Sequence, residues 1–167
     1  MPKVFVSIGS NIDPADNVRS AVAALRHRFG HLELSSVYES EPVGFDGARF
    51  YNLVAAFETN LSLVDINRRL RQIEDAHGRV RGGDKFDSRT LDLDVLLFGS
   101  LVDHVRGIPR HEIDEYAFVL KPLAEIAGDV NHPKTGHSFK TMWERFPAAS
   151  QRLWRVEAGL GKDRGVG

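Results

Sequence analysis

Hydrophobic residues in the first thirty positions change from the spacing of a strand to the spacing of a helix. Residues 3–9, KVFVSIG, are rich in β-branched residues, and a Gly-Ser-Asn turn follows at 9–11. Asp13 and Pro14 come next, as an expected N-cap and first helical residue. Apolar residues then recur at three- and four-residue intervals as far as Gly30. The pattern predicts a strand and then a helix with one buried face.

The same alternation continues in the middle of the chain. Residues 31–38 and 51–60 are typical of strands, and the segment between them is rich in Gly, Pro and acidic residues, as expected of a loop. A second helix is predicted to open at Ser62 as its N-cap and to end before Gly78. Its apolar face should contain Leu63, Ile66, Leu70 and Ile73.

The stretch RTLDLDVLLFG, residues 89–99, predicts a strand that contains two aspartates. Asp is rare in strands, and Asp92 and Asp94 are two residues apart, so they lie on one face of the strand. One reading is the solvated face of an edge strand, with Leu93 and Val95 turned inward. The other reading is a functional carboxylate pair.

A basic loop directly precedes this strand and favours the second reading. Residues 79–89 hold four cations around a Gly-Gly pair, without the apolar spacing of a helix or strand. Taken alone, such a loop is usually only solvated. Two carboxylates are suitable ligands for Mg²⁺, and neighbouring Arg and Lys side chains can bind phosphate oxygens. Together the two features predict phosphoryl-transfer chemistry.

Composition narrows the class of protein. A chain of 167 residues with 42% hydrophobic residues suits one folded domain, expected over residues 1–158, with a disordered tail at 159–167. The net charge of −1 gives no global attraction to nucleic acid or an anionic membrane. Without cysteine, disulfides and thiolate chemistry are excluded. No signal peptide or membrane span is evident, so we expect a cytoplasmic protein.

These motifs resemble the hydroxymethyl-dihydropterin pyrophosphokinase family. The resemblance rests on GRVR followed by RTLDLDVLLFG, and extends to VSIGSN near the start, NLVAAFET in the middle and FVLKPLAEIA at 118–127. It implies transfer of diphosphate from ATP to a dihydropterin alcohol. It also implies an α+β fold with a ferredoxin-like antiparallel sheet and helices on its faces, and a monomer or weak dimer.

The resemblance further implies a role for each matching residue. The expected catalytic set combines two Mg²⁺ ligands with three phosphate-binding arginines: Asp92, Asp94, Arg79, Arg81 and Arg89. The further ATP-binding residues are Glu74, Lys85, Arg110 and His111. The pterin-binding residues are Ser40, Val43, Phe50, Asn52, Phe86, Asp92 and Phe118, with Phe118 stacking on the ring.

Four departures from the family pattern change details of this expectation. The family presents His directly after Pro, whereas this chain has Pro109-Arg110-His111, so we expect Arg110 to take over that phosphate contact. Tyr116 stands where an Arg is usual. Phe86 replaces a Trp, and Ser40-Glu41 replaces Thr-Pro before the pterin loop. The extra carboxylate leaves open a paralogue with an altered pterin preference.

Two other classes stay open. A different Mg²⁺-dependent nucleotidyltransferase would also have a Gly-Ser and an acidic pair, although here they lie some eighty residues apart. A non-catalytic ligand- or RNA-binding module would need an aromatic, basic sheet face, which the sequence does not indicate. The histidine pairs His27/His31 and His132/His137 are expected at the surface and not as metal ligands.

Overall fold

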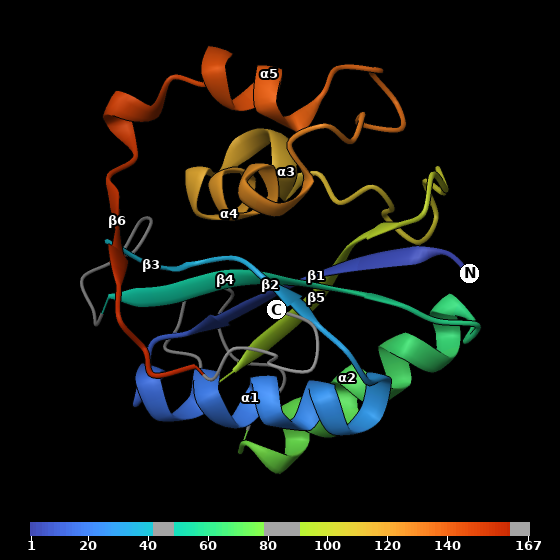
Figure 1. Cartoon of the computed structure of the whole chain (residues 1–167), viewed down its shortest axis with the longest axis vertical. Coiled ribbons are helices and arrows are strands. Elements are labelled where there is room, and N and C mark those ends of the chain that lie inside the picture. The colour runs from blue at the N-terminus through green and yellow to red at the C-terminus, as the bar shows by residue number, and fades with distance from the viewer. Residues whose placement is uncertain (42–48, 79–90, 161–167) are drawn as a thin grey trace.

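The computed structural model describes residues 1–41, 49–78 and 91–160, in which helices alternate with one antiparallel sheet (Figure 1). In chain order the elements are β1 (Lys3–Ser10), α1 (Pro14–Phe29), β2 (Glu33–Leu34), β3 (Val37–Ser40), β4 (Phe50–Glu58), α2 (Leu63–Ala76), β5 (Asp92–Phe98), α3 (Glu112–Glu115), α4 (Ala117–Ala127), α5 (Phe139–Arg145), the 3₁₀ helix η1 (Ala148–Ser150) and β6 (Leu153–Val156).

The strand order is β5-β1-β4-β3-β6, with β2 also paired to β4, and every pair is antiparallel. Helices α1 and α2 lie on one face of the sheet, and α3, α4 and α5 lie on the other (Figure 1). Each face has its own hydrophobic cluster. Leu25, Leu70 and Leu93 belong to the cluster on the α1 and α2 side, whereas Leu96 and Leu120 belong to the other.

The predicted helix ends are confirmed. Asp13 is the N-cap of α1 in a left-handed conformation, with φ of 41°, and its carbonyl oxygen accepts the Asn17 N–H at 3.0 Å. Ser62 caps α2 by accepting the Asp65 N–H at 3.1 Å. The four apolar residues predicted for the α2 face are all buried. A side-chain cap therefore starts α2, whereas α1 starts with a backbone hydrogen bond and with Pro14 at its first position.

The strand predicted over 31–38 was wrong in detail, because the chain forms two short strands there. The hydroxyl oxygen of Ser35 accepts the Val54 N–H at 2.9 Å, in place of a backbone carbonyl. This side-chain hydrogen bond interrupts the backbone ladder with β4 at Ser35, so that β2 and β3 pair with β4 as two separate strands. The expectation of surface histidines was wrong for His132, which is 2% exposed, and burial lowers its pKa.

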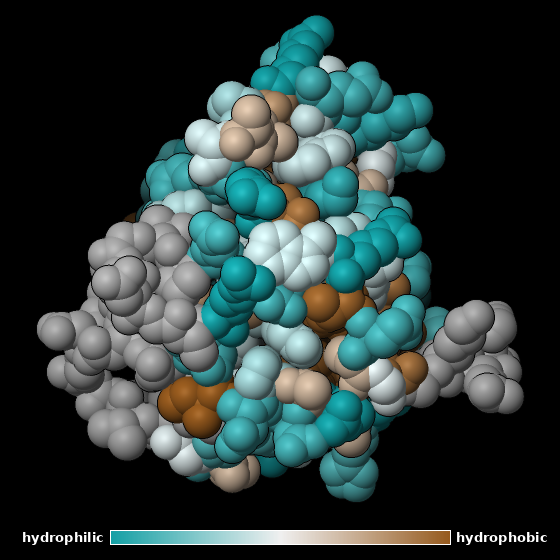
Figure 2. Space-filling view, turned by 90° about the vertical axis from the view of Figure 1, so that its left-hand side faces the viewer, coloured by the Kyte–Doolittle hydropathy of each residue, from teal (hydrophilic) through white to brown (hydrophobic). Residues whose placement is uncertain are grey.

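The strand β6 forms an edge of the described sheet and carries the exposed Arg155, and the exposed Arg152 directly precedes it. Charged residues on an edge strand oppose pairing with a second sheet. The face of the molecule viewed from this side is mainly hydrophilic, with hydrophobic residues in small separate groups (Figure 2). Among the described helices, none is both long and apolar enough to cross a bilayer.

Candidate active site

Strand β5 directs its two aspartates away from the α1 and α2 layer. Leu93 and Val95 pack in the cluster beneath the sheet, and side chains alternate along a strand. Asp92 and Asp94 therefore lie on the face covered by α3 and α4. Both side chains are partly exposed. The same-face arrangement predicted from their spacing is confirmed, and it is a solvent-accessible face.

Helix α2 holds the outer edge of β5 at the residue between the two aspartates. The Glu74 carboxylate accepts the Leu93 N–H at 2.8 Å, and Arg71 donates to the Leu93 carbonyl oxygen at 2.5 Å. Arg71 and Glu74 are also ion-paired at 3.0 Å. Glu74, expected near the nucleotide, is 1% exposed. The hydrogen bond from Leu93 to the Glu74 carboxylate fixes the strand that carries the two aspartates.

Two guanidinium groups flank the Asp94 carboxylate. Arg110 lies 3.5 Å and Arg71 3.9 Å from its Oδ1 atom. The pKa of Asp94 is raised to about 6: burial is the largest cause, Arg110 and Arg71 oppose the rise, and Asp92 and Glu112 add to it. Burial alone would lower the pKa of Arg110, but Asp94 and Glu112 reverse the effect and raise it. The site thus concentrates charge of both signs.

A pH-dependent stability follows from the raised pKa of Asp94. The folded protein binds this proton more tightly than the unfolded chain, whose Asp pKa is ~3.9. The resulting stabilisation is present below about pH 4 and is lost as the pH rises through about 6. In magnesium-free buffer, Asp94→Asn should therefore raise the free energy of unfolding near neutral pH by about 1–3 kcal/mol, with little change near pH 4.

Urea denaturation of both proteins at the two pH values measures this difference. A variant that is less stable than the wild type near neutral pH would show that Asp94 is held favourably as a carboxylate. An equal gain at both pH values would also contradict the titration account.

A cross-strand row places Asn52 and Asp92 on either side of Gly9. Gly9 of β1 pairs with Asn52 of β4 and with Asp92 of β5. A Cβ atom on Gly9 would lie 2.9 Å from Asn52 Oδ1 and 3.9 Å from Asp92 Cβ. The missing side chain therefore leaves room for the Asn52 amide. The Nδ2 atom of buried Asn52 has no hydrogen-bond partner among the described residues, as expected of a ligand-binding donor.

Adding a methyl group at Gly9 should disturb this row. We expect Gly9→Ala to displace the Asn52 side chain and to weaken use of the pterin by about tenfold to a hundredfold, the effect of leaving a polar group of the substrate unpaired. Steady-state kinetics with varied pterin measures the change. The double variant with Asn52→Ala should lose no more than Asn52→Ala alone. Fully additive losses would show that Gly9 acts independently of Asn52.

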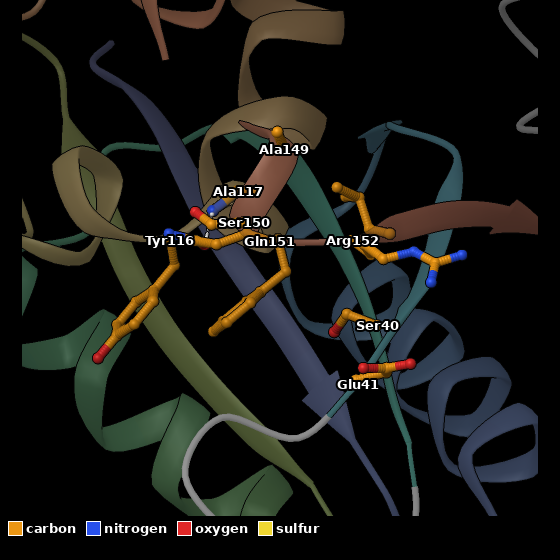
Figure 3. A pocket seen from close by; sticks show the side chains of 10 residues that line it. Ser40, Glu41, Tyr116, Ala117, Ala149, Ser150, Gln151 and Arg152 are labelled. Carbon is orange, nitrogen blue, oxygen red and sulfur yellow. Dashed lines mark hydrogen bonds between the residues drawn. The ribbon is translucent and has the colours of Figure 1, made fainter. Parts of the chain in front are cut away.

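A second part of the site is a pocket of about 330 Å³ between β3, the start of α4 and the segment 149–153. Its lining includes Ser40 and Phe118, two expected pterin residues, together with Glu41. Tyr116 lies on one side, and Ser40, Glu41 and Arg152 lie on the other (Figure 3). The structure thus brings two predicted pterin residues together, although they are far apart in the sequence.

The side chains of Arg110 and His111 contact different residues. Arg110 contacts Asp94 and donates from Nε to Glu112 at 3.0 Å, with one third of its side chain exposed. The His111 side chain is 67% exposed and its ring nitrogens lie 3.2 Å from Glu112 and Glu115. Of these two residues, Arg110 is the one that reaches the aspartate pair.

Several predicted site residues lie outside the described residues, and Phe50 is at the start of β4. Those outside are Val43, Arg79, Arg81, Lys85, Phe86 and Arg89.

Arg71 lies at the site but was not predicted from the sequence. The signal available for it was its position three residues before Glu74 on the same helix face. Its place beside Asp94 depends on tertiary packing, which spacing does not give.

The donor set fits magnesium. Within residues 1–41, 49–78 and 91–160, no cluster of three or more His, Cys, Asp or Glu side chains is arranged to hold a metal on its own. Mg²⁺ typically takes one or two carboxylates and completes its shell with water and substrate phosphate oxygens. Asp92 and Asp94 supply the two carboxylates. The residues therefore match a metal that is bound together with its phosphate substrate.

Comparisons with known proteins identify the family of this chain. A family model described as 7,8-dihydro-6-hydroxymethylpterin-pyrophosphokinase (HPPK) matches residues 5–128. Two similar proteins are named 2-amino-4-hydroxy-6-hydroxymethyldihydropteridine pyrophosphokinase. The one from Pseudomonas aeruginosa is 40% identical over 141 residues, which cover 81% of this chain and 86% of that protein. The one from Bacillus subtilis is 32% identical over 162 residues, covering 93% and 92%.

A solved structure shows the same fold. The crystal structure of Plasmodium falciparum HPPK-DHPS wild type with SDX-DHP has a TM-score of 0.68 at 11% identity. The match covers 87% of this chain but only 43% of that longer chain. The family model and the bacterial relatives confirm the resemblance predicted from the motifs: the chain belongs to the 7,8-dihydro-6-hydroxymethylpterin-pyrophosphokinase family.

Proposed function

We propose that this protein transfers diphosphate from ATP to the hydroxymethyl group of 6-hydroxymethyl-7,8-dihydropterin, giving AMP and the pterin diphosphate used in folate biosynthesis. The observation that carries the proposal is the row in which Asn52 and Asp92 flank Gly9. It puts a buried amide suited to a polar ring near a carboxylate pair suited to magnesium and phosphate, with only β1 between their strands. Membership of the family supports the same reaction.

In this reaction the hydroxymethyl oxygen attacks the β-phosphorus of ATP. The bond from that phosphorus to the oxygen bridging the α- and β-phosphates breaks, AMP leaves with the bridging oxygen, and the hydroxyl proton is released. Such a transfer needs alignment of the two substrates and stabilisation of the developing charge, and little covalent help from the protein.

The residues divide between these two tasks. Asp92 and Asp94 would hold two magnesium ions, which would neutralise charge on the phosphate groups. Arg110, next to Asp94, would bind a phosphate on the same side. The residues outside the described ranges keep the phosphate or pterin roles that the family resemblance implies: Val43, Arg79, Arg81, Lys85, Phe86 and Arg89.

The pterin would be held by the row and the pocket together. Asn52 would bind the polar edge of the ring, Phe118 would stack on its face, and Ser40 and Phe50 would complete the site. Phe118 is only partly buried, so its ring has an open surface, as stacking requires. Glu41 lines the same pocket and is the residue we expect to distinguish this protein's pterin preference from that of its relatives.

The same proposal includes the fold type, the domain bounds, the oligomeric state and the cellular location of the protein. The order β5-β1-β4-β3, with α1 and α2 as connections, supports a ferredoxin-like sheet covered by helices. We propose one domain over residues 1–158, although Leu160 of the expected tail packs against the core. The charged edge strand β6 supports a monomer or weak dimer, and ATP as co-substrate supports a cytoplasmic enzyme.

Separation of the nucleotides after incubation with ATP, magnesium and a set of pterin alcohols tests the reaction class. AMP formation that depends on 6-hydroxymethyl-7,8-dihydropterin supports the proposal. Release of pyrophosphate would identify a nucleotidyltransferase instead. Absence of any nucleotide product with every pterin would favour a binding module.

A further inference from the structure

Helices α3 and α4 are separated by a single residue, Tyr116, which has the extended backbone angles φ −123° and ψ 127°. The Tyr116 ring stacks on the Phe118 ring, with centroids 4.9 Å apart and planes inclined by 12°. In the described structure, the Tyr116 side chain makes no capping hydrogen bond with α4. The first turn of α4, which carries Phe118, must therefore be fixed by another group.

That group is the side-chain amide of Gln151, from the far end of the chain. Its Oε1 atom accepts the Ala117 N–H at 2.8 Å, and its Nε2 atom donates to the Glu115 carbonyl oxygen at 2.9 Å. One amide thus satisfies backbone groups of Glu115, the last residue of α3, and of Ala117, the first of α4. Gln151, Tyr116 and Ala117 are labelled in Figure 3. Its carbonyl and its NH₂ group are each matched by the opposite backbone group.

Gln151 is itself tied to the opposite wall of the pocket. Two residues further on, Leu153 of β6 pairs with Ser40 of β3. Both Ser40 and Phe118 line the pocket, and so does Gln151. The segment from Gln151 to Leu153 is consequently a short link between the sheet edge and the aromatic pair Tyr116 and Phe118.

We propose that Gln151 is a positioning residue for the pterin site, which holds the Phe118 ring at a fixed distance from Ser40 by clamping the junction of α3 and α4. The inference rests on the proposed function, because it assigns Phe118 to pterin stacking. A stacking ring contributes fully only when its plane is held before the ligand arrives, so loosening the junction weakens binding of the pterin and leaves the aspartate pair unaffected.

The test compares Gln151→Met and Gln151→Glu with the wild type. Met has similar length and makes neither hydrogen bond. Glu retains an acceptor for Ala117 and loses the donor to Glu115. We expect KM for the pterin to rise roughly tenfold in Gln151→Met, as for the loss of two neutral hydrogen bonds, and by less in Gln151→Glu. The KM for ATP should stay close to the wild-type value, and the melting temperature should fall by only a few degrees, about 2–4 °C per kcal/mol lost. Gln72→Met, on the exposed surface of α2, is the matched control and should not change either KM.

Equal KM values for the pterin in the wild type and Gln151→Met would overturn the proposal. So would a parallel rise in KM for ATP, since that would indicate a general loss of structure. Fluorescence titration of the pterin in the presence of magnesium and a non-hydrolysable ATP analogue gives a second, activity-independent readout. If the wild type formed no AMP, the proposed function would fail, whereas equal or unequal pterin affinities in this titration would still decide the role of Gln151.

Discussion

Asp92→Asn should lower turnover by about a hundredfold to a thousandfold while leaving the fold intact, the range found when one preorganised electrostatic group is removed from an active site. The substitution keeps the shape of the side chain and removes its charge. Asp92 lies on the open face of β5, beside Gly9 of β1, and Asn52 lies on the other side of Gly9. The loss should therefore come from weaker magnesium and phosphate binding and not from lost packing.

Asp94→Asn should show a comparable loss, together with the gain in stability near neutral pH described above. Asp129→Asn, at an exposed position after α4, is the matched control for removing one carboxylate. Turnover with magnesium as the only metal and thermal melting should be measured on all four proteins. Normal turnover in either β5 variant would remove the aspartate pair from the mechanism.

Arg110→Ala should reduce kcat/KM for ATP by about tenfold to more than a hundredfold, corresponding to ~1.5–3 kcal/mol for a hydrogen bond to a charged group. His111→Ala should have a smaller effect. The guanidinium of Arg110 lies 3.5 Å from Asp94, whereas the His111 ring contacts Glu112 and Glu115. A guanidinium also stays charged at neutral pH and can bind two phosphate oxygens at once.

The two variants should be compared side by side with saturating pterin. Arg110→Lys is informative as well, because it keeps the charge and loses the two-pronged geometry, so it should recover only part of the activity. A severe loss in His111→Ala combined with near-normal activity in Arg110→Ala would show that the histidine performs the phosphate contact despite its displacement by one position.

Those parts of the fold that depend on local patterns were predictable from the sequence. The strand at 3–9, the helix after Pro14 and the helix capped by Ser62 are confirmed, because periodicity and end-capping are properties of neighbouring residues. The interruption at Ser35 and the edge strand β6 were not predicted. The first depends on a hydrogen bond to Val54, and the second is four residues long and is defined by its pairing with β3.

The candidate site also has a part that local sequence patterns predict and a part that depends on tertiary contacts. The spacing of Asp92 and Asp94 was enough to place both on one face of β5, and the family motifs singled out Ser40, Asn52 and Phe118. Arg71 and Gln151 could not be found from the sequence, since each acts on a segment brought near by folding. Arg71 reaches β5 from α2, and Gln151 reaches a helix junction 34 residues away in the chain. The contact of Glu74 with the backbone of Leu93 was not predicted for the same reason, and its role toward ATP stays a prediction.

The most direct test of diphosphate transfer follows the β-phosphate of ATP. With ATP labelled at the β-phosphorus, 6-hydroxymethyl-7,8-dihydropterin and magnesium, the wild type should move the label into the pterin product in a one-to-one ratio with unlabelled AMP, and Asp92→Asn should move almost none. Label recovered in ADP or in free pyrophosphate, with the pterin unlabelled, would contradict the account.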